Sequence, residues 1–326
     1  MRQLLRTAAC ALAGLLALGT LNTAAAADAY PSKPVKILVG YSAGGAVDAI
    51  ARSVGQRMTA TLGQPVIVEN KPGAGTNIAV KALTTAAPDG YTLLLAANAL
   101  AVNPSLFEPA PYDLERDVAP VALVGRVPVV FTVREDSAIK TLPALVAAAK
   151  AKPGGLTIAT PGNGSTPHLA MELFQHTAGL QLRHVPYKGG AQAITDALGG
   201  HVDVVAVNAL EALPLVKGGK LRVLAVMSTE RSAVLPGVPT VAESGYPGFE
   251  ASVWYGFVAP AGLPAPVLGK LHEAVQKALE SKEVRDQLAA AGGVPLPGPA
   301  AQFEKLLKTD AARYGQLIRE ANIKPD

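Results

Sequence analysis

The residues that point most directly to chemistry are Gly40-Tyr41-Ser42-Ala43-Gly44, which fit the pattern G-x-S-x-G. In one large class of hydrolases this pattern forms a sharp turn from strand to helix that exposes a nucleophilic serine. The same stretch can also place a glycine turn at a helix N-terminus, where free backbone N–H groups bind an anion. Two functions are therefore in competition: a secreted α/β serine hydrolase that uses Ser42, and a protein that binds its ligand unchanged.

A serine nucleophile needs partners that this sequence does not supply. Ser42 follows the first strand expected after the N-terminal segment, so no upstream loop is available to lend an oxyanion N–H group. All five histidines lie downstream, and none has the setting of a late triad residue: His168, His176, His184, His201 and His272. Because serine is a poor nucleophile without a base, we interpret the motif as a binding loop and expect no enzymatic activity and no catalytic residue.

The glycine turn occurs three times. Besides the first loop, residues 71–77 (KPGAGTN) and 160–166 (TPGNGST) each follow an expected strand and precede an expected helix. Glycine lets the backbone approach a ligand closely, and the helix that follows offers N–H groups and a partial positive charge. None of the three ends in the Gly-Lys-Ser/Thr of a phosphate-binding loop, which disfavours nucleotides.

The N-terminal residues have the pattern of an export signal. Arg2 and Arg6 precede an apolar run over residues 8–19, and small residues follow at 22–27. We expect residues 1–26 to be a signal peptide, cleaved near Ala26 or Ala27, and a periplasmic protein. Cys10, the only cysteine, lies inside this segment, so the mature chain is expected to use neither disulfides nor thiol chemistry.

Composition narrows the partners further. The formal net charge is +4 over 326 residues, without a basic cluster interleaved with aromatics, and nucleic-acid binding is not expected. The histidines lack metal-ligand spacing with a third partner, so we expect no metal and no cofactor.

From Val35 onward strands and helices alternate, which predicts an α/β fold with parallel sheets. The pattern restarts after a long apolar stretch over residues 118–133, and a second such run covers residues 251–259. We therefore expect two domains linked by crossing strands, residues 27–127 plus 250–326 and residues 128–249. Ligands of such sheets bind beyond the carboxyl ends of the strands, and here also between the domains.

Several blocks, in order along the chain, carry a family resemblance: YPSKPVKILVGYSAGGAVDAIAR, VIVENKPGAGTNIA, APDGYTLLLA, HVPYKGGAQAITDALGGHVDV and WYGFVAPAGLP. They resemble the Bug family of periplasmic solute receptors, the binding proteins of tripartite tricarboxylate transporters. The resemblance implies a hinged, periplasmic-binding-protein-like fold of two domains, each a mostly parallel sheet flanked by helices. It also implies a monomer that closes on a small carboxylate and delivers it to membrane permease subunits.

In that family backbone amides, hydroxyls and bridging waters at the glycine loops hold the carboxylate. Ala43 and Gln192 stand where family members often have proline. The resemblance thus implies a ligand site made of Tyr41, Ser42, Ala43, Gly44, Gly45, Asp48, Gly73, Gly75, Thr76, Asn77, Asn98, Gly162, Gly164, Ser165, Thr166, Tyr187 and Asn208.

Four polar or aromatic residues need a separate interpretation. Asp48 either stabilises the first turn of its helix through the helix dipole or accepts an ammonium group, in which case Asp48→Asn should abolish amino-acid binding and spare dicarboxylates. We expect Lys188 to be solvated, His168 to cap or pack rather than bind, and Trp254 to lie in the core. The identity of the carboxylate, whether dicarboxylate, aromatic acid or amino acid, stays open.

Overall fold

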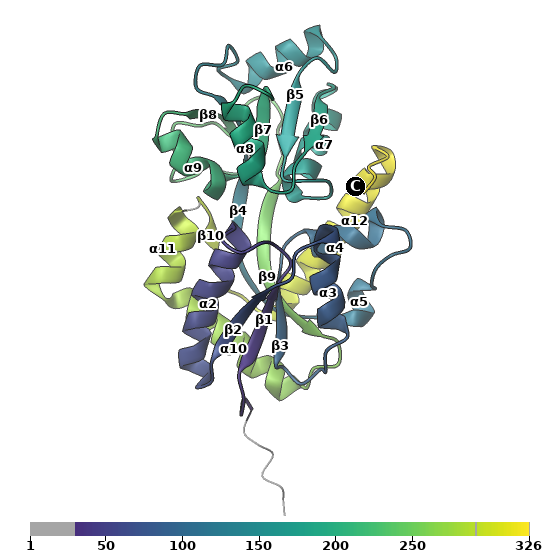
Figure 1. The fold of residues 1–326 in the computed structure, drawn as a ribbon, viewed down its shortest axis with the longest axis vertical. Helices are drawn as coiled ribbons and strands as arrows, with labels where there is room; N and C mark the ends of the chain where they lie inside the picture. Colours follow the sequence, from purple (N-terminus) through teal and green to yellow (C-terminus); the bar gives the residue numbers. More distant parts are fainter. Residues whose placement is uncertain (1–29, 291, 326) are drawn as a thin grey trace, which may run out of the picture. The chain divides into compact units, whose positions relative to one another are not determined.

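The computed structural model describes residues 30–290 and 292–325, so the expected signal peptide lies outside the described residues. From Lys33 to Asp326 the chain forms one compact unit. Within this unit the strands gather into two groups, one around β1 to β3 and one around β5 to β8 (Figure 1). We call these groups, with the helices that cover them, the first lobe and the second lobe.

The first lobe is built on three parallel strands in the order β2-β1-β3. The central strand is buried at four of its five positions, as its continuous apolar run predicts. The strands are β1 (Val35–Val39), β2 (Val66–Asn70) and β3 (Thr92–Ala96), and the helices between and after them are α2 (Ala46–Leu62), the short 3-10 turn η1 (Ala74–Thr76), α3 (Asn77–Thr84), α4 (Ala99–Leu106) and α5 (Leu114–Asp117).

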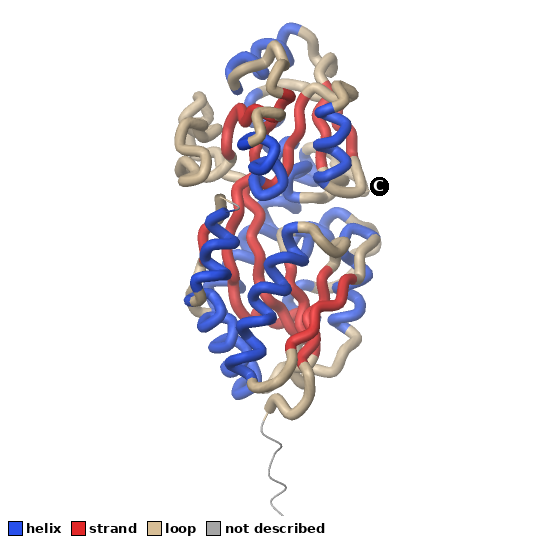
Figure 2. Tube along the Cα trace, turned by 60° about the vertical axis from the view of Figure 1, so that its left-hand side comes forward, coloured by secondary structure: helices blue, strands red, loops and turns tan. Residues whose placement is uncertain are grey.

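The second lobe repeats this plan with the parallel order β6-β5-β7. Helices lie around these strands in the upper half of Figures 1 and 2. The elements are α6 (Leu142–Ala151), β5 (Thr157–Thr160), α7 (Thr166–Ala178), β6 (Arg183–Pro186), α8 (Gly190–Leu198), β7 (Val204–Asn208), α9 (Ala209–Lys217) and β8 (Leu221–Val226).

One long strand, β4 (Val118–Arg134), runs through both lobes. Its first half pairs antiparallel with β9 (Ser252–Pro260), and its second half pairs antiparallel with β7 and β8. The register shifts twice in the first half, once after Pro120 and once before Gly125, where proline and glycine weaken a regular ladder. The expected crossing segments are thus present, and the apolar stretch over 118–133 is one continuous strand.

The rest of the chain returns to the first lobe. Helix α10 packs against α2, and α12 packs against α4 and β4. The remaining elements are α10 (Ala265–Glu280), α11 (Lys282–Ala290), the two-residue strand β10 (Val294–Pro295) and α12 (Ala300–Glu320). Both sheets are therefore mixed rather than mostly parallel, because β4 and β9 cross between the lobes in antiparallel pairing. The predicted α/β class itself is confirmed.

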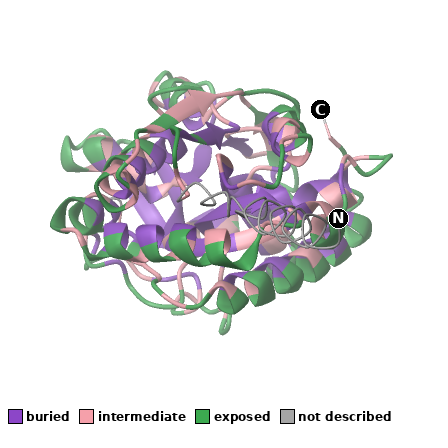
Figure 3. Cartoon of the chain, turned by 90° about the horizontal axis from the view of Figure 1, so that it is seen from below, coloured by how far each residue is buried: buried purple, intermediate pink, exposed green. Residues whose placement is uncertain are grey.

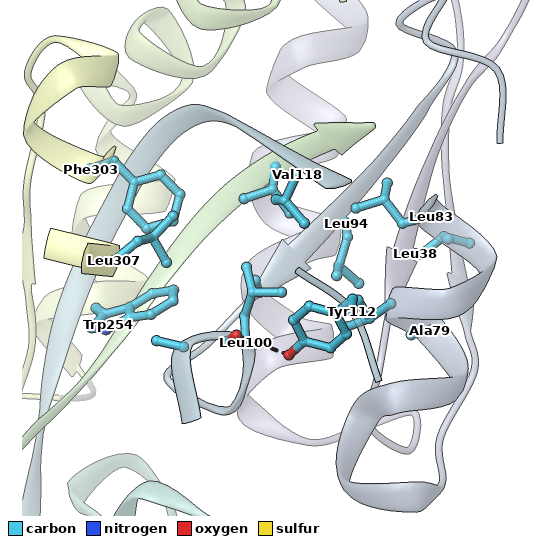
Figure 4. Close-up of a cluster of buried hydrophobic side chains, with 14 of the residues drawn as sticks. Leu38, Ala79, Leu83, Leu94, Leu100, Tyr112, Val118, Trp254, Phe303 and Leu307 are labelled. Carbon is cyan, nitrogen blue, oxygen red and sulfur yellow. Dashed lines mark hydrogen bonds between the residues drawn. The ribbon is translucent and has the colours of Figure 1, made fainter. Parts of the chain in front are cut away.

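A buried apolar cluster of the first lobe joins β3, β9 and α12. Trp254 is 2% exposed, and its ring meets Phe303 edge-on at 5.2 Å between centroids (Figure 4). Close by, Tyr112 donates a hydrogen bond to the carbonyl of Leu100. The prediction that Trp254 belongs to the core is confirmed.

A second apolar cluster joins the two lobes on the side of α12. Leu169 of α7 packs with Leu106 of α4 and with Tyr314, Leu317 and Ile318 of α12. In both Figure 1 and Figure 2 the C-terminal end of α12 lies beside the second lobe. Seen from below, the helices are exposed along their outer faces while the strands between them are buried (Figure 3). In the described part of the chain no helix is long and apolar enough to cross a membrane.

Candidate ligand-binding site

Loops from both lobes line one cavity of about 520 Å³. This volume lies in the range of small-molecule sites. The lining residues come from the segments that follow β1, β2, β5 and β6 and from helix α4: Gly40, Tyr41, Ser42, Pro72, Gly73, Ala74, Gly75, Thr76, Ala99, Asn103, Pro161, Gly162, Asn163, Gly164, Ser165, Tyr187 and Lys188. The three glycine loops predicted from the sequence thus meet at one cavity.

The first loop, residues 40–45, leads from β1 into α2. Gly44 has φ +83°, a left-handed conformation that favours glycine, and Gly45 is the N-cap residue of α2. The side-chain amide of Asn70 donates to the carbonyl of Tyr41 at 3.0 Å and so ties the loop to the end of β2. Desolvation raises the pKa of the Tyr41 phenol to about 12, so Tyr41 is a neutral hydrogen-bonding group at neutral pH.

The side chain of Asp48 holds this loop in place through hydrogen bonds. Its carboxylate accepts hydrogen bonds from the amide of Gly44 at 2.9 Å and from the side chain of Asn70 at 3.0 Å. Arg52 donates to both of its oxygens. Burial alone raises the pKa of Asp48, but the hydrogen bonds from Arg52, Gly44 and Asn70 outweigh it and lower the pKa. Asp48 is an ionised carboxylate whose donors come from this chain.

The second loop carries an unusual backbone. Four consecutive residues, Gly73 to Thr76, have positive φ: +121°, +47°, +60° and +80°. Positive φ is costly for Ala74 and especially for β-branched Thr76, and such strain is concentrated at functional sites. The strained turn packs against the first loop, since a Cβ atom on Gly40 would stand 2.7 Å from Cβ of Thr76.

Asn103 of α4 supports the same turn. Its side-chain amide donates to the carbonyl of Gly75 and to Oδ1 of Asn77, both at 2.7 Å. Asn103 also lines the cavity, and sequence reasoning missed it. The only signal was an asparagine within an apolar helix, and that helix was itself not predicted.

The third loop belongs to the second lobe. Gly162 and Gly164 have φ +130° and +72°, and a Cβ atom on Gly162 would stand 2.8 Å from the carbonyl oxygen of Tyr187. Ser165 is the N-cap of α7, where its hydroxyl donates to the carbonyl of Gly162 at 2.6 Å and accepts from the amide of His168 at 3.4 Å. A helix N-terminus is therefore presented to the cavity from this side as well.

Two stacked histidines support the third loop. The rings of His168 and His184 lie 4.1 Å apart and nearly parallel, and Nδ1 of His168 accepts from the amide of Gly164 at 3.0 Å. Nε2 of His184 lies 2.7 Å from the hydroxyl of Thr160. Burial, together with the neighbouring His168, lowers the pKa of His184 to about 3. The expectation that His168 packs rather than binds is confirmed, and no cluster of potential metal ligands is present among the described residues.

Tyr187 and Lys188 complete the wall from the turn before α8. The hydroxyl of Tyr187 donates to Asp196 at 2.5 Å, and this bond, with some burial, raises the pKa of Tyr187 to about 12. Lys188 is exposed, as predicted, and also lines the cavity. It is the one lysine or arginine among the lining residues.

The remaining predicted residues lie outside the lining. Asn98 is 1% exposed and binds Trp254, Ser252 and Asp310 inside the first lobe. Ala43, Gly44 and Gly45 belong to the first loop, Asp48, Asn77 and Thr166 to the helices that follow the loops, and Asn208 to the end of β7. None of these residues is in the lining of the cavity.

The geometry around Ser42 does not assemble a hydrolase. Ser42 is exposed and lines the cavity, but no histidine is among the lining residues. His168 is 4% exposed and uses Nδ1 to hold Gly164, and Nδ1 of His272 lies 2.9 Å from the carbonyl of Val121. Among the residues that line the cavity, Ser42 therefore has no histidine that could take its proton.

Two lobes joined by crossing strands, with helix N-termini and glycine loops facing one cavity, define a solute-binding protein. Sequence comparison agrees: residues 50–323 match the family described as "Tripartite tricarboxylate transporter family receptor". The chain belongs to this family of periplasmic receptors, and the resemblance seen in the sequence is confirmed.

Individual relatives support the assignment. BugT of Bordetella pertussis is 38% identical over 300 residues, which cover 91% of this chain and 92% of the relative. R. palustris Rpa4515, solved with adipate, has a TM-score of 0.84 and 30% identity over 91% of this chain and 100% of its own. MatC from Rhodopseudomonas palustris, solved with bound malate, has a TM-score of 0.81 and 31% identity over 89% of this chain and 100% of its own.

Proposed function

We propose that this protein captures a small organic carboxylate in the 520 Å³ cavity and delivers it to the permease subunits of a tripartite tricarboxylate transporter. The observation that carries the proposal is that glycine loops of both lobes line this one cavity. Adipate and malate, the ligands in the two related structures, have the chemistry that such loops accept.

The binding energy comes from main-chain and hydroxyl donors. Hydrogen bonds to an ionised group contribute about 1.5–3 kcal/mol each. Three or four of them, less the entropy lost on binding, give about −8 kcal/mol, which is a micromolar dissociation constant. In the proposed site they are donated by main-chain or hydroxyl groups of Tyr41, Ser42, Gly75 and Thr76, which line the cavity. Gly162, Gly164, Ser165 and Tyr187 form the opposite wall, where the amides of the two glycines and the two hydroxyl groups already donate within the second lobe.

Closure of two domains is the proposed mechanism. We assign residues 27–127 plus 250–326 to one domain and residues 128–249 to the other, with β4 and β9 as the connection. A ligand that contacts both domains favours the closed arrangement by its differential affinity for it. The proposed protein is a periplasmic monomer, exported by a signal peptide cleaved near residue 26 or 27.

The protein is proposed to leave its ligand chemically unchanged. An assay with chromogenic esters separates this from the hydrolase alternative. Wild type and Ser42→Ala should show the same background rate, and a rate that disappears with the hydroxyl would establish the hydrolase.

A ligand screen tests the binding function directly. Thermal-shift measurements with mono- and dicarboxylates, followed by titration calorimetry, should identify an acid that raises Tm, since a ligand of the native state stabilises it. Gly162→Ala should weaken that acid at least 10-fold, because the new Cβ atom collides with Tyr187. Gly63→Ala is the matched control: Gly63 has φ +68°, nothing within 4 Å of the added Cβ atom, and a place at the far end of α2. Equal losses in both variants would show that the third loop does not bind the acid.

A further inference from the structure

Asn208 and Glu211 stand at the start of α9 in positions that usually satisfy each other. Asn208 is the N-cap residue and Glu211 is the third residue of the helix, the spacing of a capping box. Yet Asn208 makes no side-chain cap hydrogen bond. Its Oδ1 atom and Oε2 of Glu211 are buried without a hydrogen-bond partner among the described residues. Oδ1 of Asn208 and Oε2 of Glu211 are therefore hydrogen-bond acceptors that the helix itself does not use.

Glu211 points toward the turn that closes the cavity. A Cβ atom on Gly190, the first residue of α8, would stand 2.0 Å from Oε2 of Glu211, so the carboxyl group presses against this turn. Lys188, two residues earlier, lines the cavity. Oε2 of Glu211 makes no hydrogen bond to this turn, because it has no partner among the described residues.

Tyr255 brings in a polar atom from the first lobe. Its hydroxyl on β9 is buried and, like the two acceptors, has no partner among the described residues. Burial raises the pKa of Tyr255, and the charges of Glu211 and Tyr41 raise it further. Three of the six buried unpartnered side-chain atoms in the described chain thus belong to Asn208, Glu211 and Tyr255, and Tyr41, whose charge acts on Tyr255, lines the cavity.

We propose that Glu211, Asn208 and Tyr255 form a second polar subsite beside the cavity, and that this subsite receives the ammonium group of an α-amino acid. The inference rests on the proposed function, in which the glycine loops bind the carboxylate of the same molecule. Buried polar groups are retained when something satisfies them, and an ammonium group is a donor without an acceptor, which matches the oxygens of Asn208 and Glu211. Asp48, the earlier candidate for this role, is occupied by Arg52, Asn70 and Gly44.

The charge of Glu211 agrees with this assignment. Burial raises its pKa to about 7, so near neutral pH Glu211 is only partly ionised, and an ammonium group beside it would favour the ionised form. A second carboxylate at the same place would be repelled by the ionised form. The subsite therefore separates amino acids from the corresponding acids that lack the amine.

The test uses acids in pairs that differ only in the α-amino group: L-aspartate and succinate, L-glutamate and glutarate, L-leucine and 4-methylpentanoate, L-phenylalanine and 3-phenylpropanoate. Dissociation constants of wild type are measured by calorimetry at pH 8, where Glu211 is ionised. For the pair that binds best, the amino acid should bind at least 10-fold more tightly than its partner. Glu211→Gln should lower the affinity for the amino acid at least 10-fold and leave the amine-free acid within about 3-fold.

Two further variants make the result specific. Glu280→Gln removes the same charge from an exposed position on α10 and should change neither affinity. Tyr255→Phe deletes a hydroxyl that has no partner in the fold, so it should fold and should weaken only the amino acid. An amine-free acid that binds as tightly as its amino acid overturns the subsite and leaves the proposed function standing. If no acid of either series binds, the proposed function fails as well.

Discussion

Arg52 binds both carboxylate oxygens of Asp48 from one turn further along α2, with Nε 3.0 Å from Oδ2 and a terminal guanidinium nitrogen 2.9 Å from Oδ1. This fork is the geometry in which arginine recognises a carboxylate best. Here the carboxylate is part of the protein, and the pair supports the loop that begins the cavity. We therefore expect Asp48 to act through the amide of Gly44.

Asp48→Asn should reduce binding of all acids alike, by about 3- to 10-fold, because it loosens the first loop instead of removing a contact to one ligand group. It should also lower the free energy of unfolding at pH 7 by about 1–3 kcal/mol. The pKa of Asp48 is lowered in the fold, so this stabilisation is present above the unfolded value of 3.8 and is lost as the pH falls below it. Urea unfolding at pH 7 and pH 3 measures the loss of unfolding free energy and its dependence on pH. If the variant lost only the binding of amino acids, Asp48 would be the residue that binds the ammonium group.

Gly164 and Leu106 face each other across the lobes, and a Cβ atom on Gly164 would stand 2.4 Å from Cδ2 of Leu106. Gly164→Ala should therefore weaken carboxylate binding at least 10-fold, since the third loop can no longer approach α4. Gly154→Ala is a close control, because its φ of +69° matches the +72° of Gly164 and nothing lies within 4 Å of its added Cβ atom. It should cost only the left-handed strain of about 1–2 kcal/mol.

A double-mutant cycle isolates the collision. Leu106→Ala in the Gly164→Ala background removes the obstructing methyl group and should recover part of the lost affinity, with a coupling of about 1 kcal/mol or more. Strictly additive effects would show that strain at Gly164, and not its contact with Leu106, sets the affinity.

Glu211 should lower the free energy of unfolding of the ligand-free protein as the pH rises. Its pKa in the fold is about 7 against 4.5 as the ordinary value, so between these values the folded state holds a proton that the unfolded state has lost. Stability from this group is complete below pH 4.5 and falls as the pH rises to about 7. Glu211→Gln should therefore gain on wild type by about 3 kcal/mol between pH 4.5 and pH 8. Denaturant unfolding at both pH values measures the gain, and the other titrating groups cancel in the comparison. A constant difference would mean that Glu211 titrates normally.

His184 should stay neutral in the folded protein down to acidic pH, because its pKa is lowered to about 3. Since the unfolded histidine takes up a proton near its ordinary pKa of 6.5, its share of the stability is present above that value and is lost as the pH falls. Imidazole proton NMR, assigned with a His184→Gln variant, should show one ring that does not titrate between pH 8 and pH 4. A midpoint near 6 for this ring would contradict its burial against His168.

Local patterns predicted many elements of this protein accurately. The apolar runs over Val35–Val39 and Leu221–Val226 form strands, and the helix after Gly45 has Gly63, with a φ of +68°, as its C-cap residue. These signals are local, since apolar runs, helical spacing and glycine stops act within a few residues. Helix α4 was not predicted because it is buried over most of its length and contains Pro104. Its sequence therefore shows neither a polar face nor a clear helix boundary.

The sequence by itself determined the alternation of strands and helices, the glycine turns after three strands and the family to which the chain belongs, because each of these is written in neighbouring residues. Only the tertiary structure decided which polar groups face a ligand. It turned Asn98 inward to Asp310 and Trp254 and surrounded Asp48 with Arg52 and Asn70. It also left Oε2 of Glu211 and the hydroxyl of Tyr255 without a partner among the described residues. The physical reason is that a hydrogen-bonding group is defined by what surrounds it, and those partners are brought together only when distant segments fold against one another.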